Sequence, residues 1–153
     1  MKIYIGADHR GYQLKEFLKD KLTDYEVIDM GAFEHAPQDD FVDFAKLVGH
    51  KVATDREARG ILTCGSGAGM CMAANKIAGI RSTVAHSAEE VKASRNDDDL
   101  NVLVLPADFI SQEEAVAITQ AFLTTEFAPE ERFIRRIAKI TNLEERDAES
   151  SSA

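Results

Sequence analysis

Short apolar runs rich in β-branched residues alternate along this chain with stretches of helical periodicity. Strands are expected over Lys2–Ala7, Glu26–Asp29, Gly60–Cys64, Arg81–Ala85 and Asn101–Pro106. Most of the stretches between them repeat apolar residues every three or four positions, which is the spacing of an amphipathic helix. The alternation predicts a single three-layer αβα domain. Its centre is a Rossmann-like parallel sheet of about five strands, and a further helix lies at the C-terminus.

Helix starts are marked by capping residues. Ser87–Glu90 and Ser111–Glu114 each have the serine-to-glutamate spacing of a capping box. Asp40 is expected to cap a helix whose apolar stripe begins at Phe41. These signals place three helix starts just after loops, as the alternating pattern requires.

The C-terminal region is predicted to form one more helix, opened by Pro129. Its inward face is expected to carry Phe133, Ile137 and Ile140. We expect the domain to span residues 1–146 and the polar segment 147–153 to fray.

Charge and cysteine content exclude several classes of protein. Among 153 residues, 27 acidic side chains outnumber 18 basic ones, so the formal net charge is −9 and non-specific binding to nucleic acid or to an anionic membrane is not expected. No apolar run approaches the ~20 residues that span a bilayer. Met1–Gly6 leads directly into a strand, and Cys64 and Cys71 suit free thiols, so we expect a cytoplasmic protein.

Three alternating glycines follow the third expected strand, at Gly65, Gly67 and Gly69. Such a loop can turn backbone N–H groups around an anion. It is not a Walker loop, because no Gly-Lys-Ser/Thr follows, and Met70 occupies the third glycine position of a dinucleotide fingerprint. It is not a hydrolase elbow either, because Cys64 stands where that motif needs glycine.

Cys64 is the strongest chemical candidate in this loop. A thiol beside a helix N-terminus is expected to have a lowered pKa, which would make Cys64 a base or a nucleophile. The alternative is that Cys64 is a small core residue that ends a strand. Cys71, one turn further on, is expected to serve packing.

Two further groups of polar residues are candidates. Asp8, His9 and Arg10 follow the first strand. Either they bind a ligand there, or Asp8 caps the next helix and His9 and Arg10 are solvated. Arg132 and Arg136 are four residues apart, so they form either a phosphate clamp or a solvated basic face. The histidines show no metal-ligand spacing, and no metal site is expected.

Several segments together resemble one family, the type B ribose-5-phosphate isomerases, which are related to the subunits of galactose-6-phosphate isomerase. The segments are Gly6–Tyr12, Val27–Gly31, Thr63–Gly69, Ala73–Arg81, Ser94–Arg95, Asn101–Leu103 and the pair Arg132 and Arg136. The resemblance covers roughly residues 1–140.

The resemblance implies an aldose–ketose isomerase that uses neither metal nor organic cofactor. Cys64 would move a proton between C1 and C2 of a sugar phosphate through a cis-enediolate. The amides of Gly65–Gly69, with Ser66, would stabilise the oxygen that becomes negative. Some members use a glutamate where this chain has Met70, so the chain resembles the cysteine-dependent branch.

The resemblance also implies how substrate is held. Asp8 would bind sugar hydroxyls, and His9, Arg132 and Arg136 would bind the phosphate. Members are dimers or tetramers whose sites a neighbouring subunit completes, so a homodimer or tetramer with shared sites is implied.

The chain departs from the family at four positions. The family has a His-Asn pair whose histidine opens the sugar ring. Asp97 replaces that histidine and Asp98 replaces the asparagine. Asp108 replaces an arginine near the phosphate, and Phe41 replaces a pocket tyrosine. In the family the first three positions belong to the side that the partner contributes. If aspartate takes over there, Asp97 would act in ring opening and Asp98 in substrate binding.

Three functions therefore stay open. The first is an isomerase for ribose 5-phosphate, or for another sugar phosphate such as a tetrose or hexose phosphate. The second is a non-catalytic sugar-phosphate-binding subunit, which the aspartates at 97 and 98 favour. The third is a thiol enzyme built on Cys64, against which stands the lack of a Cys-x-x-Cys motif.

Overall fold

The computed structural model describes residues 1–152, apart from the side chains of residues 146 and 147. In chain order the elements are β1 (Lys2–Ala7), α1 (Tyr12–Lys21), β2 (Glu26–Asp29), α2 (Phe41–Thr54), β3 (Arg59–Cys64), α3 (Ala68–Ala74), β4 (Ser82–Val84), α4 (Ala88–Asp98), β5 (Val102–Pro106), α5 (Gln112–Thr124) and α6 (Glu131–Ser151). All five expected strands are present, with ends that differ by at most one residue from the prediction.

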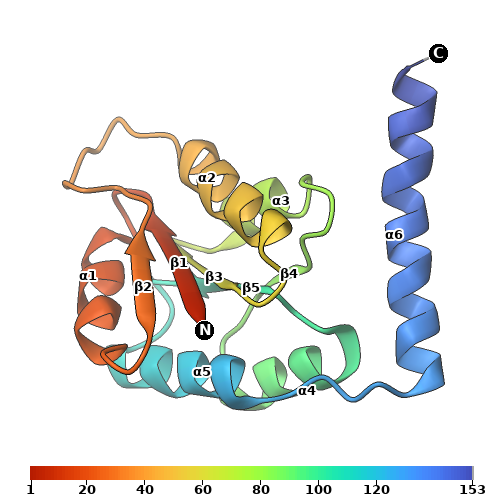
Figure 1. Cartoon of the computed structure of the whole chain (residues 1–153). Helices are drawn as coiled ribbons and strands as arrows, with labels where there is room; N and C mark the ends of the chain where they lie inside the picture. The colour runs from red at the N-terminus through yellow and green to blue at the C-terminus, as the bar shows by residue number, and fades with distance from the viewer. Residues whose placement is uncertain (153) are drawn as a thin grey trace.

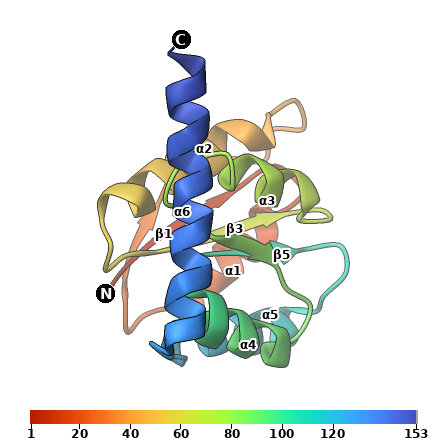
Figure 2. The same ribbon diagram turned by 90° about the vertical axis from the view of Figure 1, so that its right-hand side faces the viewer.

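The five strands form one parallel sheet in the order β2-β1-β3-β5-β4. Helices α2 and α3 cover one face and α1, α4 and α5 cover the other, so the expected αβα layers are confirmed (Figure 1). Helix α6 stands beside these layers and not within them (Figures 1 and 2).

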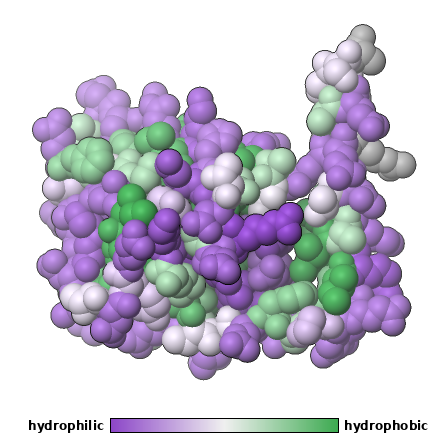
Figure 3. Space-filling model, in the orientation of Figure 1, coloured by the Kyte–Doolittle hydropathy of each residue, from purple (hydrophilic) through white to green (hydrophobic). Residues whose placement is uncertain are grey.

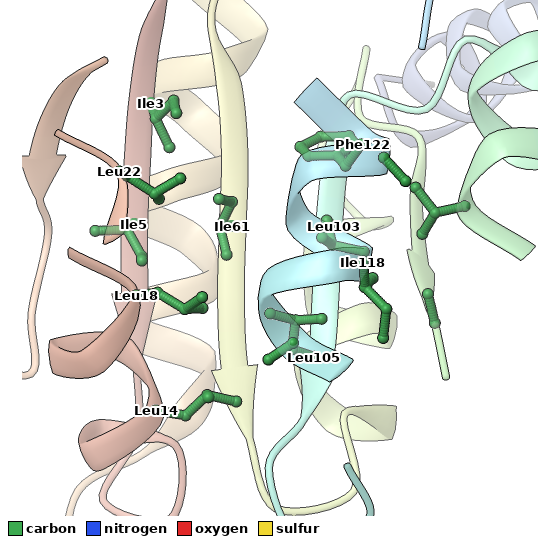
Figure 4. Close-up of a cluster of buried hydrophobic side chains, with 14 of the residues drawn as sticks. Ile3, Ile5, Leu14, Leu18, Leu22, Ile61, Leu103, Leu105, Ile118 and Phe122 are labelled. Carbon is green, nitrogen blue, oxygen red and sulfur yellow. The ribbon is translucent and has the colours of Figure 1, made fainter. Parts of the chain in front are cut away.

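Alternating strand residues build a core on each face of the sheet. Ile3 and Ile5 of β1 point toward the α1 side, near Leu18, and Phe122 of α5 extends the same cluster over β5 (Figure 4). The intervening Tyr4 faces the other way, toward α2 and α3. Because both faces are covered, the central strands are apolar almost throughout, as in other buried parallel sheets.

Both predicted capping boxes are present. At Ser87 and at Ser111 the hydroxyl accepts the N–H of the glutamate three residues on, and that glutamate accepts the serine N–H in return. The prediction that the Asp40 carboxylate caps a helix is wrong. Asp40 does precede α2, but its carboxylate accepts no capping hydrogen bond.

The prediction for α6 is wrong in part. Phe133 is buried, but Ile140 is 43% exposed and Ile137 only half-buried. The helix contacts the body mainly at α4, and further along Glu144 accepts the Gly79 N–H. These contacts leave much of its apolar stripe exposed, including Ile134 and Leu143. The helix also continues through the segment predicted to fray, as far as Ser151; fraying there stays a prediction.

The strand order determines where a ligand can bind. The chain crosses from β2 back over β1 to reach β3, so β1 and β3 are neighbours whose connections leave in opposite directions. In such folds ligands bind beyond the carboxyl ends of those strands. Asp8 follows β1 and Cys64 ends β3, so the predicted site lies at this point. No helix among the described residues is long and apolar enough to cross a membrane.

Candidate active site

Asp8 braces the turn between β1 and α1. Its side chain is buried, and its Oδ1 accepts the backbone N–H of Arg10 and of Gly11, each at 3.0 Å. The turn is also tied to β3, because Thr63 donates its hydroxyl to the Gly11 carbonyl at 2.8 Å. Asp8 therefore stabilises the start of α1, which is the structural one of the two roles expected for it. It does so directly beside the end of β3.

Cys64 lies below the surface at the carboxyl end of β3. The residue is 5% exposed and packs with Met70 on the α2–α3 face of the sheet. Burial raises the pKa of the Cys64 thiol, although the N–H groups of Met70 and Gly67 act in the opposite direction. The expectation of a lowered pKa is therefore wrong. The helix N-terminus does contribute, but removal of the thiol from water outweighs it.

The glycine loop turns sharply above this thiol. Gly67 has a φ of 81°, in the left-handed region that favours glycine, and α3 begins directly after it. Ser66 is exposed, and its hydroxyl accepts the N–H of Ala68 at 3.4 Å. Among the residues that the structure describes, the N–H groups of Ser66 and Gly69 have no hydrogen-bond partner. These two amides are free to bind an anionic oxygen.

Phe41 packs against the glycine loop. Its ring lies against Gly69, where a Cβ added to the glycine would come within 2.6 Å of the ring. The residue is 38% exposed, so it borders both the loop and solvent.

His9 is held by a residue that sequence reasoning missed. Asp39, in the loop before α2, accepts the backbone N–H of His9 at 3.1 Å, and the same Oδ1 lies 2.7 Å from His9 Nδ1. The carboxylate is largely buried. Because Nδ1 is engaged by Asp39, Nε2 is the ring atom left for a ligand. Thirty residues separate the two positions, and no local spacing could have indicated the pair.

Asp108 is placed differently from the prediction. It was expected on the side that the partner contributes, but it forms an ion pair with Arg10 of its own chain. Its backbone N–H also donates to the Gly65 carbonyl at 3.0 Å. The turn after β5 follows β3 closely, because the strands are paired up to Cys64 and Pro106, and this pairing carries Asp108 to the glycine loop.

The other predicted site residues form a separate group. Asp97 and Asp98 end α4, close to the start of β5, whereas Cys64 lies opposite the far end of that strand. The length of β5 alone, about 13 Å, separates these levels of the sheet. Arg132 and Arg136 belong to the same group, because the Ala128 N–H donates to the Asn96 carbonyl and so places the start of α6 beside the end of α4. One chain therefore does not bring these four residues to Cys64.

No cluster of three or more metal-ligating side chains occurs among the described residues. Both cysteines are free thiols. Cys71 is half-buried and lies 3.5 Å from the Ser82 carbonyl, which fits the packing role expected for it.

Comparison with known proteins identifies the family. The model of the Ribose/Galactose Isomerase family matches residues 3–140. This chain belongs to that family. The resemblance inferred from its motifs is thereby confirmed over nearly the same range.

Individual relatives agree. A Mycoplasma pneumoniae protein named probable ribose-5-phosphate isomerase B is 38% identical over 140 residues, which are 90% of this chain and 91% of the relative. Ribose-5-phosphate isomerase B of Clostridium thermocellum has a TM-score of 0.91 at 37% identity, covering 95% of this chain and 99% of that one. The Mycoplasma genitalium enzyme, solved with bound ribulose 5-phosphate, has a TM-score of 0.87 at 38% identity, covering 94% and 96%.

Proposed function

We propose that this chain interconverts an aldose phosphate and a ketose phosphate, with ribose 5-phosphate and ribulose 5-phosphate as the expected pair. The observation that carries the proposal is the position of Cys64, beneath the glycine loop and beside Asp8, in a member of a sugar isomerase family. The Mycoplasma genitalium relative that holds ribulose 5-phosphate supports the choice of sugar.

In the proposed reaction Cys64 is the base. Its thiolate takes the C2 proton of the open-chain aldose, and the C2–H electrons form a C1–C2 double bond while O1 becomes negative. The thiol then returns the proton to C1, O1 is protonated, and O2 loses its proton to become the new carbonyl oxygen. Because burial raises the pKa of this thiol, the thiolate needs the N–H groups of Met70 and Gly67 directed at it.

The loop amides supply the matching electrostatic help. The N–H groups of Ser66 and Gly69 are fixed in place before substrate arrives, so they can stabilise the enediolate oxygen without reorganising. Asp8 would orient sugar hydroxyls with the oxygen that the turn does not use, and His9 would present Nε2 to the phosphate. No metal or organic cofactor enters this scheme.

We further propose that the active form is a homodimer, or a tetramer, with shared sites. Along α6, Ile134, Ile140 and Leu143 are 50%, 43% and 62% exposed, and Figure 3 shows hydrophobic residues open to view on this helix. A second copy would cover this face. The same contact would let the partner supply its Arg132 and Arg136 to the phosphate and its Asp97 and Asp98 to the sugar. The free thiols suit a cytoplasmic location.

One observation favours a second candidate, an isomerase for a tetrose phosphate. The group formed by Asp97, Asp98, Arg132 and Arg136 contains no imidazole, so it lacks the usual residue for opening a sugar ring. A tetrose phosphate has too few carbons to close a ring through its phosphorylated end and needs no such residue.

The test is proton NMR of ribose 5-phosphate with the protein in D2O, with Cys64→Ala and Cys71→Ala as a matched pair. We expect ribulose 5-phosphate and deuterium exchange at C2 with the parent and with Cys71→Ala, and neither with Cys64→Ala. Turnover by Cys64→Ala would overturn the assignment of the base. Deuterium exchange at C2 of a tetrose phosphate, but not of ribose 5-phosphate, would select the second candidate. Binding of a sugar phosphate with no deuterium exchange would show a non-catalytic binding protein.

A further inference from the structure

Arg10 and Asp108 meet above the glycine loop that follows Cys64. Arg10 extends from the β1–α1 turn, and its guanidinium lies over Gly65 so closely that a Cβ there would be 2.3 Å from Cζ. Its Nη2 pairs with the carboxylate of Asp108, in the turn after β5. The pair therefore bridges the ends of two strands directly above the residue that follows the thiol. Burial raises the pKa of the Cys64 thiol, and the positive charge of Arg10 acts in the opposite direction.

The backbone of Arg10 is fixed, whereas its guanidinium is weakly held. The Arg10 N–H is anchored to Asp8 at 3.0 Å, which fixes where the side chain starts. The side chain is 54% exposed, and within residues 1–152 its guanidinium has Asp108 as its one hydrogen-bond partner. Arg95 shows the contrast: its guanidinium is buried and donates to two carbonyls as well as to Asp99.

A phosphate is a better partner for this guanidinium than Asp108 is. An ion pair between exposed side chains contributes little to stability, because water screens it and both side chains lose freedom. A phosphate dianion carries more charge than a carboxylate and accepts two parallel hydrogen bonds from an arginine. The exchange of partners would need only a side-chain rotation about an anchored backbone.

We propose that Arg10 is a phosphate-binding residue of this site, and that Asp108 is the partner of its guanidinium in the free protein, which phosphate displaces. The ligand class, a phosphorylated sugar, rests on the proposed function. The assignment of Arg10 and Asp108 rests on their own geometry. Asp108 then competes with the ligand, so the two residues should affect affinity in opposite directions.

Isothermal titration calorimetry with inorganic phosphate tests this on the full chain. We expect Arg10→Gln to raise the Kd about tenfold, because a charge-assisted hydrogen bond is lost. Asp108→Asn should lower the Kd about threefold, because the competitor is removed. The double variant should match Arg10→Gln alone, since Asp108 acts through Arg10. Arg56→Gln, an exposed arginine far from this site, controls for the same change in net charge.

Titrations with ribose 5-phosphate and with ribose separate the sources of the effect. The same fold-changes are expected for the sugar phosphate and none for the unphosphorylated sugar. An unchanged Kd in Arg10→Gln, weaker binding by Asp108→Asn, or no phosphate binding by the parent would each overturn the proposal. Arg10→Lys, which keeps the charge, replaces Arg10→Gln if circular dichroism shows the latter to be unfolded. If the parent is an active isomerase but the Kd values do not change as predicted, this inference alone is overturned. If the Kd values change as predicted but the parent has no isomerase activity, the proposed function alone is overturned.

Discussion

At the scale of single residues, the site uses pairs of opposite charge more than the sequence suggested. His9 and Arg10 are consecutive, yet each has its own carboxylate from a different loop, Asp39 before α2 and Asp108 after β5. The extra aspartates therefore do not simply repel a phosphate. Asp39 and Asp108 pair with the two side chains that we propose bind the phosphate, and Asp39 does so from a largely buried position.

Asp39→Asn tests the pair with His9. The amide keeps the shape of the side chain but removes the charge that fixes His9 Nδ1. We expect the KM for the sugar phosphate to rise about tenfold, the worth of one charge-assisted hydrogen bond, with a smaller change in kcat. Steady-state kinetics measure both.

Asp40→Asn is the matched control, because Asp40 is adjacent and exposed and its carboxylate makes no hydrogen bond among the described residues. Equal effects of the two substitutions would show that Asp39 does not act through His9.

At the scale of elements, one buried lysine joins α1 to the end of β2. The Lys15 side chain is fully buried, and its Nζ donates to both oxygens of Asp29 at 2.7 and 2.8 Å and to the Ala32 carbonyl at 2.6 Å. Lys19 adds a second cation to Asp29 at 2.6 Å. The loop that leads to Asp39 starts from this point, so the network supports the site indirectly.

Asp29→Asn should destabilise the protein by about 3 kcal/mol at neutral pH, because it leaves Lys15 buried without its main counterion. Burial acts to raise the pKa of Asp29, but hydrogen bonds from Lys15 and Lys19 outweigh it and the pKa is lowered. The stabilisation is therefore complete above the ordinary pKa of about 4 and is lost as the pH falls through the lowered value.

Urea unfolding at neutral pH and at about pH 3 measures the loss, and the difference between parent and variant should shrink at the lower pH. Asp20→Asn, on the exposed side of α1, should change little at either pH. A constant difference at both values would contradict the assignment to the ionised Asp29.

Elements whose signals are local were predictable, and those that depend on partners were not. The capping boxes at Ser87 and Ser111 were correct because all their atoms lie within four residues. The inward face of α6 was wrong because an apolar stripe specifies burial but not the surface that provides it. The raised pKa of Cys64 was missed for the same reason, since it depends on packing from α3 and the sheet.

At the scale of the whole molecule, the predicted site residues separate into two groups. The sequence identified members of both, but only the strand pairing shows that Cys64 lies opposite Pro106 while Asp97 and Asp98 lie before the start of β5. No pattern along the chain encodes that separation. It is the structural reason for proposing that two copies complete each site.

Mixing two inactive variants tests this division. In a hybrid of Cys64→Ala with Arg136→Ala, one site carries both substitutions and the other carries neither. Random reassembly after unfolding and refolding should therefore restore about a quarter of the intact sites of the parent. Activity of the mixture is compared with that of each variant refolded alone.

Mixing Cys64→Ala with Cys64→Ala,Arg136→Ala is the control, since no combination of those chains contains an intact site. No recovery in the first mixture would place Arg136 in the same site as its own Cys64. Full activity of Arg136→Ala refolded alone would place Arg136 outside the site.

The position of α6 beside the body also bears on how a cell would supply this activity. If a working site requires two chains, then at concentrations below the dissociation constant of the pair the number of sites grows with the square of the amount of protein. Halving synthesis would remove three sites in four and doubling it would give four times as many. Flux through the reaction would then respond to gene expression more steeply than it would for an enzyme whose site lies within a single chain.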